Sequence, residues 1–108
     1  MIKGFETITA DLSKDELSLV PTVVKGLITK QGKDKAISGT EICKALDLTG
    51  PRLRKIINYI RVKNLLPALC SSSNGYFVAT NIYEIQDYII SLKQRIKAQV
   101  EVLNALEQ

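Results

Sequence analysis

Apolar residues between 13 and 32 recur at the three- and four-residue spacing of an amphipathic helix. Ser13 and Glu16 form a capping-box pattern at the start of this stretch, which predicts a first helix that continues toward residue 31. Pro21 lies inside the stretch, and proline removes a hydrogen bond and crowds the preceding turn. We therefore expect a break or kink near the proline, with 21–31 as the better-formed part.

A short second helix and a longer third helix follow. Ser38 and Glu41 form another capping box, with Thr40 as an alternative cap, and the apolar face after them ends near Asp47. The tetrapeptide "DLTG" then predicts a tight turn, and Pro51 stands near the first position of the next helix, where its missing N–H costs nothing. A short helix, a turn containing glycine and a longer helix predict a helix-turn-helix.

The third helix, 50–64, separates apolar and basic side chains when it is placed on a helical wheel. Its buried stripe is predicted to consist of four aliphatic residues: Leu53, Ile56, Ile57 and Ile60. The opposite side carries Lys55, Asn58 and Val62, with Pro51 at its start. Basic and aromatic side chains flank that side: Arg54 and Arg61 on one flank, and Arg52, Tyr59 and Lys63 on the other.

This arrangement matches a DNA major groove, which offers base edges at its floor and phosphates along its walls. We expect Asn58 and Lys55 to contact base edges, because asparagine bonds adenine and lysine contacts guanine acceptors. The expected phosphate contacts on and next to this helix are Thr49, Arg52, Arg54, Tyr59, Arg61 and Lys63. The alternative is a solvated basic helix that flanks an ordinary core.

The charge distribution favours the first alternative. The net charge is +4, but residues 1–47 carry seven basic and seven acidic side chains, and 84–108 carry three and four. Residues 48–83 carry five basic side chains and no acidic one. The positive excess therefore coincides with the third helix.

After Asn64 the periodicity changes to two short apolar runs around "SSSNG". Asn74-Gly75 is a strong signal for a two-residue hairpin turn. This turn would place Ser73 opposite Tyr76, Ser72 opposite Phe77, and Cys70 opposite Ala79, and Pro67 would confine its strand to a sheet edge. A helix-turn-helix followed by a hairpin predicts a winged helix. Its polar wing tip, Ser72, Ser73 and Asn74, either bonds phosphate or is simply a soluble turn.

A long final helix is predicted from Asn81, which caps it, with Glu84 closing the capping box. Aliphatic residues then follow a heptad in which Ile82 occupies position a. For 82–92 we expect this stripe to pack on the wing, and for 96–106 we expect self-association. The expected dimerisation residues are Ile89, Leu92, Ile96, Gln99, Leu103 and Leu106.

The composition argues against catalytic and metal-binding functions. The 108-residue chain has no histidine and only two cysteines, Cys43 and Cys70, both in apolar surroundings that predict buried, reduced thiols. No phosphate-binding loop, nucleophile motif or close carboxylate pair is present. No apolar run reaches the length of a membrane helix, and the start shows no signal-peptide pattern, so we expect a cytoplasmic protein without a cofactor.

Residues 36–103 contain three motifs: "RLRKIINYIR", "SNGYFVAT" and a terminal "YIISLKQRI". As a set they resemble small winged helix-turn-helix proteins of bacteriophages and prophages. The resemblance implies a DNA-binding role in phage replication or gene control, with no cofactor, and it does not extend to 1–20. Arg52, Arg54, Lys55, Asn58 and Arg61 lie on the recognition segment of that family.

The combined expectation is a mainly α (α+β) protein, not an enzyme. Residues 1–80 would form a winged helix-turn-helix domain with 1–12 as an arm, and 81–108 a coiled-coil dimerisation helix. It would bind double-stranded DNA specifically as a homodimer or other homo-oligomer, as a regulator or replication accessory in the host cytoplasm. The rival interpretation is a protein-binding adaptor that engages a host factor or virion component through the winged helix and the final helix.

Overall fold

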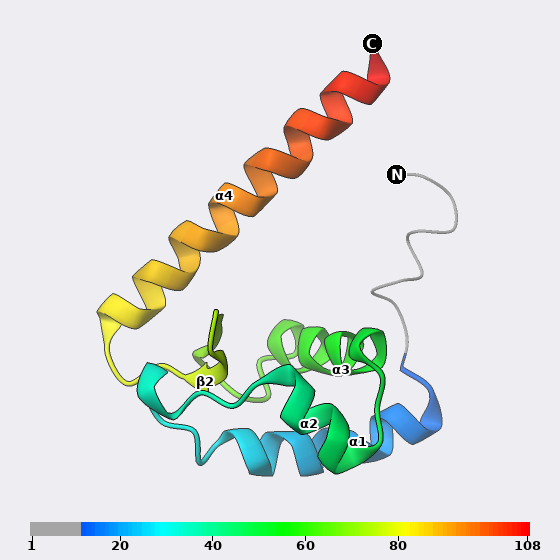
Figure 1. Ribbon diagram of the computed structural model, residues 1–108, viewed down its shortest axis with the longest axis vertical. Coiled ribbons are helices and arrows are strands. Elements are labelled where there is room, and N and C mark those ends of the chain that lie inside the picture. Colours follow the sequence, from blue (N-terminus) through cyan, green and yellow to red (C-terminus); the bar gives the residue numbers. More distant parts are fainter. Residues whose placement is uncertain (1–11) are drawn as a thin grey trace.

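The computed structural model describes residues 12–108, which form four helices and one small hairpin (Figure 1). The elements follow in the order α1 (Lys14–Leu27), the 3-10 turn η1 (Lys33–Lys35), α2 (Gly39–Leu46), α3 (Gly50–Val62), β1 (Leu69–Ser72), β2 (Gly75–Val78) and α4 (Ile82–Glu107). The chain is thus mainly helical with a two-stranded antiparallel sheet, as the predicted α+β class requires. The arm suggested for 1–12 lies outside the described residues except for Leu12, which is buried.

Helix α1 begins with the predicted capping box: the Ser13 hydroxyl accepts from the backbone N–H of Glu16, and the Glu16 carboxylate accepts from that of Ser13. Pro21 does not break the helix, because α1 runs through the proline and ends at Leu27, so the prediction of 21–31 as the better-formed part is wrong. Pro21 lies on the exposed side, whereas Val20 and Leu27 lie in the buried stripe. Packing of that stripe on the core stabilises the helix despite the missing bond.

The second helix also begins at a predicted cap, whereas the residue that caps the third, Thr49, was predicted only as a phosphate contact. The Ser38 hydroxyl accepts from the Glu41 backbone N–H, so Ser38 and not Thr40 caps α2. Asp47 ends α2 in the left-handed conformation, with φ 54°, and the chain then turns into α3. Thr49 caps α3, and Pro51 occupies its first turn, where no backbone bond is lost.

The core lies between α1, α2, α3 and the hairpin. All four residues of the predicted α3 stripe are buried, and Ile56 and Ile60 are fully so. Figure 1 shows α3 above α1, with α2 across the front of the pair. The other buried apolar residues of this core are Leu12, Val20, Val23, Leu27, Ile42, Leu66, Leu69 and Val78.

The hairpin forms where it was predicted, but the predicted register is wrong by two residues. Ser72 pairs with Gly75 and Ser71 with Tyr76, so the connecting residues are Ser73 and Asn74. Gly75 belongs to β2 and has a φ of 124°, a conformation that side chains disfavour. Gly75 was predicted to lie in the turn, whereas in the structure it lies in β2, where another segment of the chain packs closely against its backbone.

That segment is the stretch before α2. Ile37 and Tyr76 exchange backbone hydrogen bonds of 2.9 and 2.8 Å, so Ile37 lines the edge of β2 opposite β1. A Cβ at Gly75 would stand 2.1 Å from the Ile37 carbonyl oxygen, which no side chain can do. The glycine therefore allows β2 to be paired on both edges. Strand β1, which begins two residues after Pro67, forms the other edge of the sheet.

Helix α4 begins at its predicted cap, where the Asn81 side chain accepts from the Glu84 backbone N–H. It packs on β1 only through its first turns and then projects away from the body (Figure 1). No α4 residue is fully buried, and every residue after Leu92 is exposed. The half-buried residues of its first turns are Glu84, Ile85, Tyr88, Ser91 and Leu92. Within 12–108, no helix combines the length and apolar character that crossing a bilayer requires.

Candidate nucleic-acid interface

The side of α3 opposite its buried stripe remains accessible to a ligand. Pro51, Arg54 and Val62 are exposed there, and Asn58 is half-buried. Lys63 is exposed just beyond the last turn. We call these five residues the outward face of α3.

Glu16 of α1 neutralises part of the positive charge that the sequence places on α3. Its carboxylate is almost completely buried and lies 3.2 Å from Nε of Arg52 and 3.1 Å from Nζ of Lys55. It also accepts the Ser13 backbone N–H at 2.8 Å. The Ser13 bond is the largest cause that lowers the pKa of Glu16 from 4.5 to about 2, and Lys55 and Arg52 add to it while burial opposes it.

The Glu16 cluster, defined as Glu16 with Arg52 and Lys55, therefore joins α1 to one flank of α3. Both basic side chains remain partly accessible, at 41% for Arg52 and 32% for Lys55. Sequence reasoning assigned Glu16 only a capping role. Its second role has no local signal, because the two partners stand 36 and 39 positions away in the chain.

Arg61, predicted to contact phosphate, is engaged inside the protein. Its Nε donates to the Leu69 carbonyl oxygen at 3.2 Å, and its guanidinium lies 5.7 Å from the Tyr76 ring centre and 5.0 Å from that of Tyr88. One terminal nitrogen of this guanidinium is buried without a hydrogen-bond partner. Arg61 thus joins α3, the hairpin and α4, and we remove it from the candidate DNA contacts.

The remaining predicted contacts on α3 differ in accessibility. The Thr49 hydroxyl already accepts from the Arg52 backbone N–H at 3.4 Å, although Thr49 is exposed. Tyr59 is half-buried and packs against the core. Arg54 and Lys63 are therefore the exposed basic side chains of the helix.

The hairpin tip is exposed and carries no charge. Ser73 and Asn74 are exposed, and the Ser72 hydroxyl accepts from the Asn74 backbone N–H at 3.2 Å. With Ser38 and Gly39 at the start of α2, Ser72 and Ser73 line a shallow polar depression. These side chains suit hydrogen bonds to a ligand better than electrostatic attraction.

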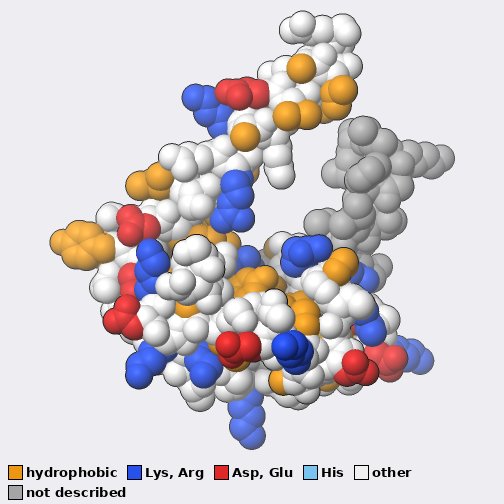
Figure 2. All heavy atoms as spheres, in the orientation of Figure 1, with side chains coloured by type: hydrophobic (Ala, Val, Ile, Leu, Met, Phe, Trp, Pro, Cys, Tyr) orange, Lys and Arg blue, Asp and Glu red, His pale blue; other side chains and the backbone are white. Residues whose placement is uncertain are grey.

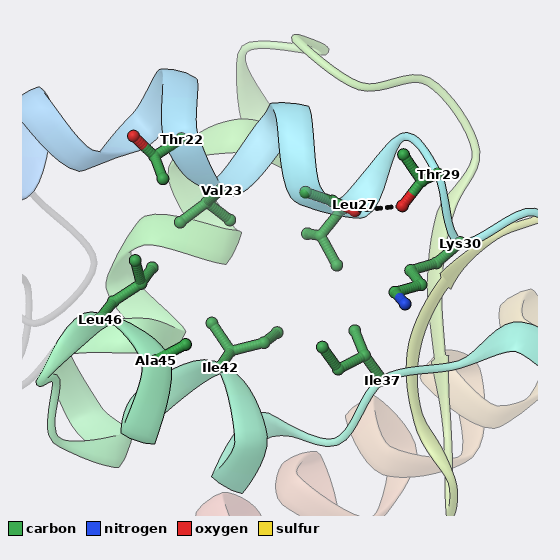
Figure 3. A pocket seen from close by; sticks show the side chains of 10 residues that line it. Thr22, Val23, Leu27, Thr29, Lys30, Ile37, Ile42, Ala45 and Leu46 are labelled. Carbon is green, nitrogen blue, oxygen red and sulfur yellow. Dashed lines mark hydrogen bonds between the residues drawn. The ribbon is translucent and has the colours of Figure 1, made fainter.

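An apolar pocket between α1 and α2 had no sequence signal. It has a volume of about 360 Å³, and Figure 3 shows Val23 and Leu27 on one side of it, facing Ile42 and Ile37 on the other. The Lys30 side chain lies at its edge. None of the residues that line this pocket belongs to the Glu16 cluster or to the outward face of α3.

The two cysteines are free thiols. Cys70 is buried, and burial raises the pKa of its thiol, whereas Cys43 is only half-buried. The buried position predicted for Cys43 is therefore reached only in part. Among 12–108, no three His, Cys, Asp or Glu side chains gather where a metal ion could bind.

Comparison with protein-family models, with curated proteins and with solved structures finds no match to this chain.

Proposed function

We propose that this chain is a phage-type, sequence-specific DNA-binding protein, a regulator or replication accessory, with a winged helix-turn-helix fold and α3 as its recognition helix. The order of α1, the paired Ile37 segment, α2, α3 and the β1–β2 hairpin supports this fold. In such a domain the helix after the short turn enters the major groove. The phage assignment rests on the resemblance of the sequence motifs.

The observation that carries the proposal is the accessibility and charge of the outward face of α3. It presents Arg54 and Lys63 as exposed cations on either side of the Asn58 amide, and no acidic side chain of α3 lies among them. Arg52 and Lys55, half-neutralised by Glu16, extend the positive charge along one flank. An amide at the centre of the helix face can contact base edges, and cations at its two sides can contact phosphates.

The electrostatic contribution should be modest. Each basic side chain that neutralises a phosphate contributes about 0.9 to the slope of log affinity against log salt concentration. The available cations on α3 are two exposed and two paired with Glu16, so we expect a slope of about −2 to −4. A single domain of this kind binds weakly at physiological salt, with much of its specificity left to Asn58.

The test compares two double variants. One combines Arg54→Ala and Lys63→Ala on α3, and the control combines Lys25→Ala and Lys35→Ala, which removes two exposed lysines outside α3. Both variants lose two positive charges, so a difference between them reports position and not net charge. We expect the α3 variant to reduce the salt slope by about two and the control to leave it nearly unchanged. Equal loss in both variants, measured by fluorescence anisotropy on a short duplex, would contradict a recognition role for α3.

Two apolar surfaces favour protein binding as a second candidate function. They are the pocket between α1 and α2 and the exposed aliphatic stripe of α4. An adaptor of this kind would keep its partner in the α3 double variant and would show no binding to duplex DNA at low salt.

A further inference from the structure

The exposed part of α4 carries a long apolar stripe that residues 12–92 do not cover. Its exposed aliphatic residues include Ile96 at 58%, Leu103 at 49% and Leu106 at 76%. Figure 2 shows hydrophobic side chains along this projecting part of the molecule. A helix with such a stripe normally packs it against another element. We call residues 93–107 the free segment, because all of them are exposed.

We propose that the free segment pairs with the free segment of a second copy in antiparallel orientation, in one defined register. The inference goes beyond DNA binding and does not depend on it. In this register Ile96 packs with Leu106 of the second copy, and Gln99 with Leu103 of the second copy. Each layer occurs twice because the pair is symmetric.

Charge complementarity selects this register. Antiparallel coiled coils bring the residues that flank the core face to face, so that Lys93 meets Glu107 of the second copy, and Glu107 meets Lys93. Val100 meets Val100 of the second copy on the same flank, and Val102 meets Val102 on the other. Lysine thus meets glutamate and valine meets valine at these flanking positions, and Arg95 gains no charged or apolar partner in this register.

A parallel pair would leave the same side chains mismatched. There, Lys93 would lie beside Tyr88 of the second copy, and Glu107 would lie beside Val102 of the second copy. Arg95 would lie beside Val100 of the second copy, so no opposite charges would meet. A parallel seam would also reach back to Leu92, which is already half-buried within its own chain.

The antiparallel register shifted by one heptad is disfavoured for the same reasons. It would place Lys93 opposite Val100 of the second copy and Arg95 opposite Val102 of the second copy. It would also bring Leu92 into the seam between the copies. The proposed register avoids both problems and places Gln99 in the core, at the cost in stability that polar core residues usually carry.

A distance measurement separates the two orientations directly. A nitroxide at Gln86→Cys, in a Cys43→Ser background, marks an exposed position on the first turns of α4. In the proposed pair the two labels are separated by roughly 30 helical positions, or about 45 Å at about 1.5 Å per residue. In a parallel pair the labels would be less than about 20 Å apart, because paired helix axes are about 10 Å apart.

A charge-reversal cycle tests the register. Lys93→Glu and Glu107→Lys should each raise the dimer dissociation constant about tenfold, and the double variant should return close to the original value. Lys97→Glu is the matched control, since Lys97 is exposed on the side of the helix away from the seam.

Sedimentation equilibrium measures these constants on the full chain. A chain that stays monomeric up to about 100 μM, a short label distance, or a double variant that fails to recover would each overturn the proposal. A label distance of about 45 Å together with recovery in the double variant would support it.

Discussion

At the scale of single residues, Glu16 is a buried charge that links α1 to α3 through its ion pairs with Arg52 and Lys55. Its pKa falls from 4.5 in an unfolded chain to about 2 in the folded one, so the folded state holds its proton less tightly. The stabilisation from this difference is fully present above about pH 4.5. It is lost as the pH falls through about 2, because below that pH the carboxylate is protonated in both states.

Glu16→Gln keeps the capping-box pattern and removes only the charge. We expect the free energy of unfolding at neutral pH to fall by about 1–3 kcal/mol, since Arg52 and Lys55 lose a charged partner but remain partly solvated. The difference from the unsubstituted chain should shrink below about pH 4. Urea denaturation across this pH range measures it, with Glu41→Gln, an exposed first-turn glutamate, as the control. A difference independent of pH would contradict the ionised cluster.

At the scale of elements, Arg61 connects the hairpin, α3 and the first turns of α4. Arg61→Ala removes a hydrogen bond to Leu69 and two aromatic contacts, so we expect the free energy of unfolding to fall by about 1–2 kcal/mol. Hydrogen exchange in the first turns of α4 should quicken, because Tyr88 loses its partner. Arg54→Ala, one exposed arginine on the same helix, should change stability by less than about 0.5 kcal/mol and weaken DNA binding instead. Reversed phenotypes would return Arg61 to the DNA interface.

Elements whose signals are local were predictable from the sequence, and those whose signals are distant were not. Ser13, Ser38 and Asn81 cap helices because each bonds a backbone group three residues away, which the sequence displays. Gly75 was predicted as a turn residue, but a glycine is required there because Ile37, from a distant part of the chain, packs against its backbone. For the same reason the helical wheel placed Arg61 on a flank of the outer side and gave no signal for Leu69, Tyr76 and Tyr88, which engage it inside the protein.

At the scale of the whole molecule, α4 sets how far apart two DNA-binding bodies would stand. In the proposed antiparallel pair, the first residues of the two α4 helices are separated by roughly 38 helical positions, or about 57 Å. One turn of DNA covers only about 34 Å. A dimer of this shape is therefore suited to hold two separate duplexes, or two sites about two turns apart, and not adjacent half-sites.

A chain that ends at Leu92 tests this arrangement, because it keeps the α4 turns that contact the hairpin and loses the free segment. We expect its melting temperature to change by no more than about 2 °C at low protein concentration, since no deleted residue is buried. It should bind a single short duplex with the same salt slope as the full chain. The full chain on a bead-bound duplex should capture a second, labelled duplex, whereas the shortened chain should not. Capture by the shortened chain would place the second DNA contact within the body, and the free segment would then need a different role.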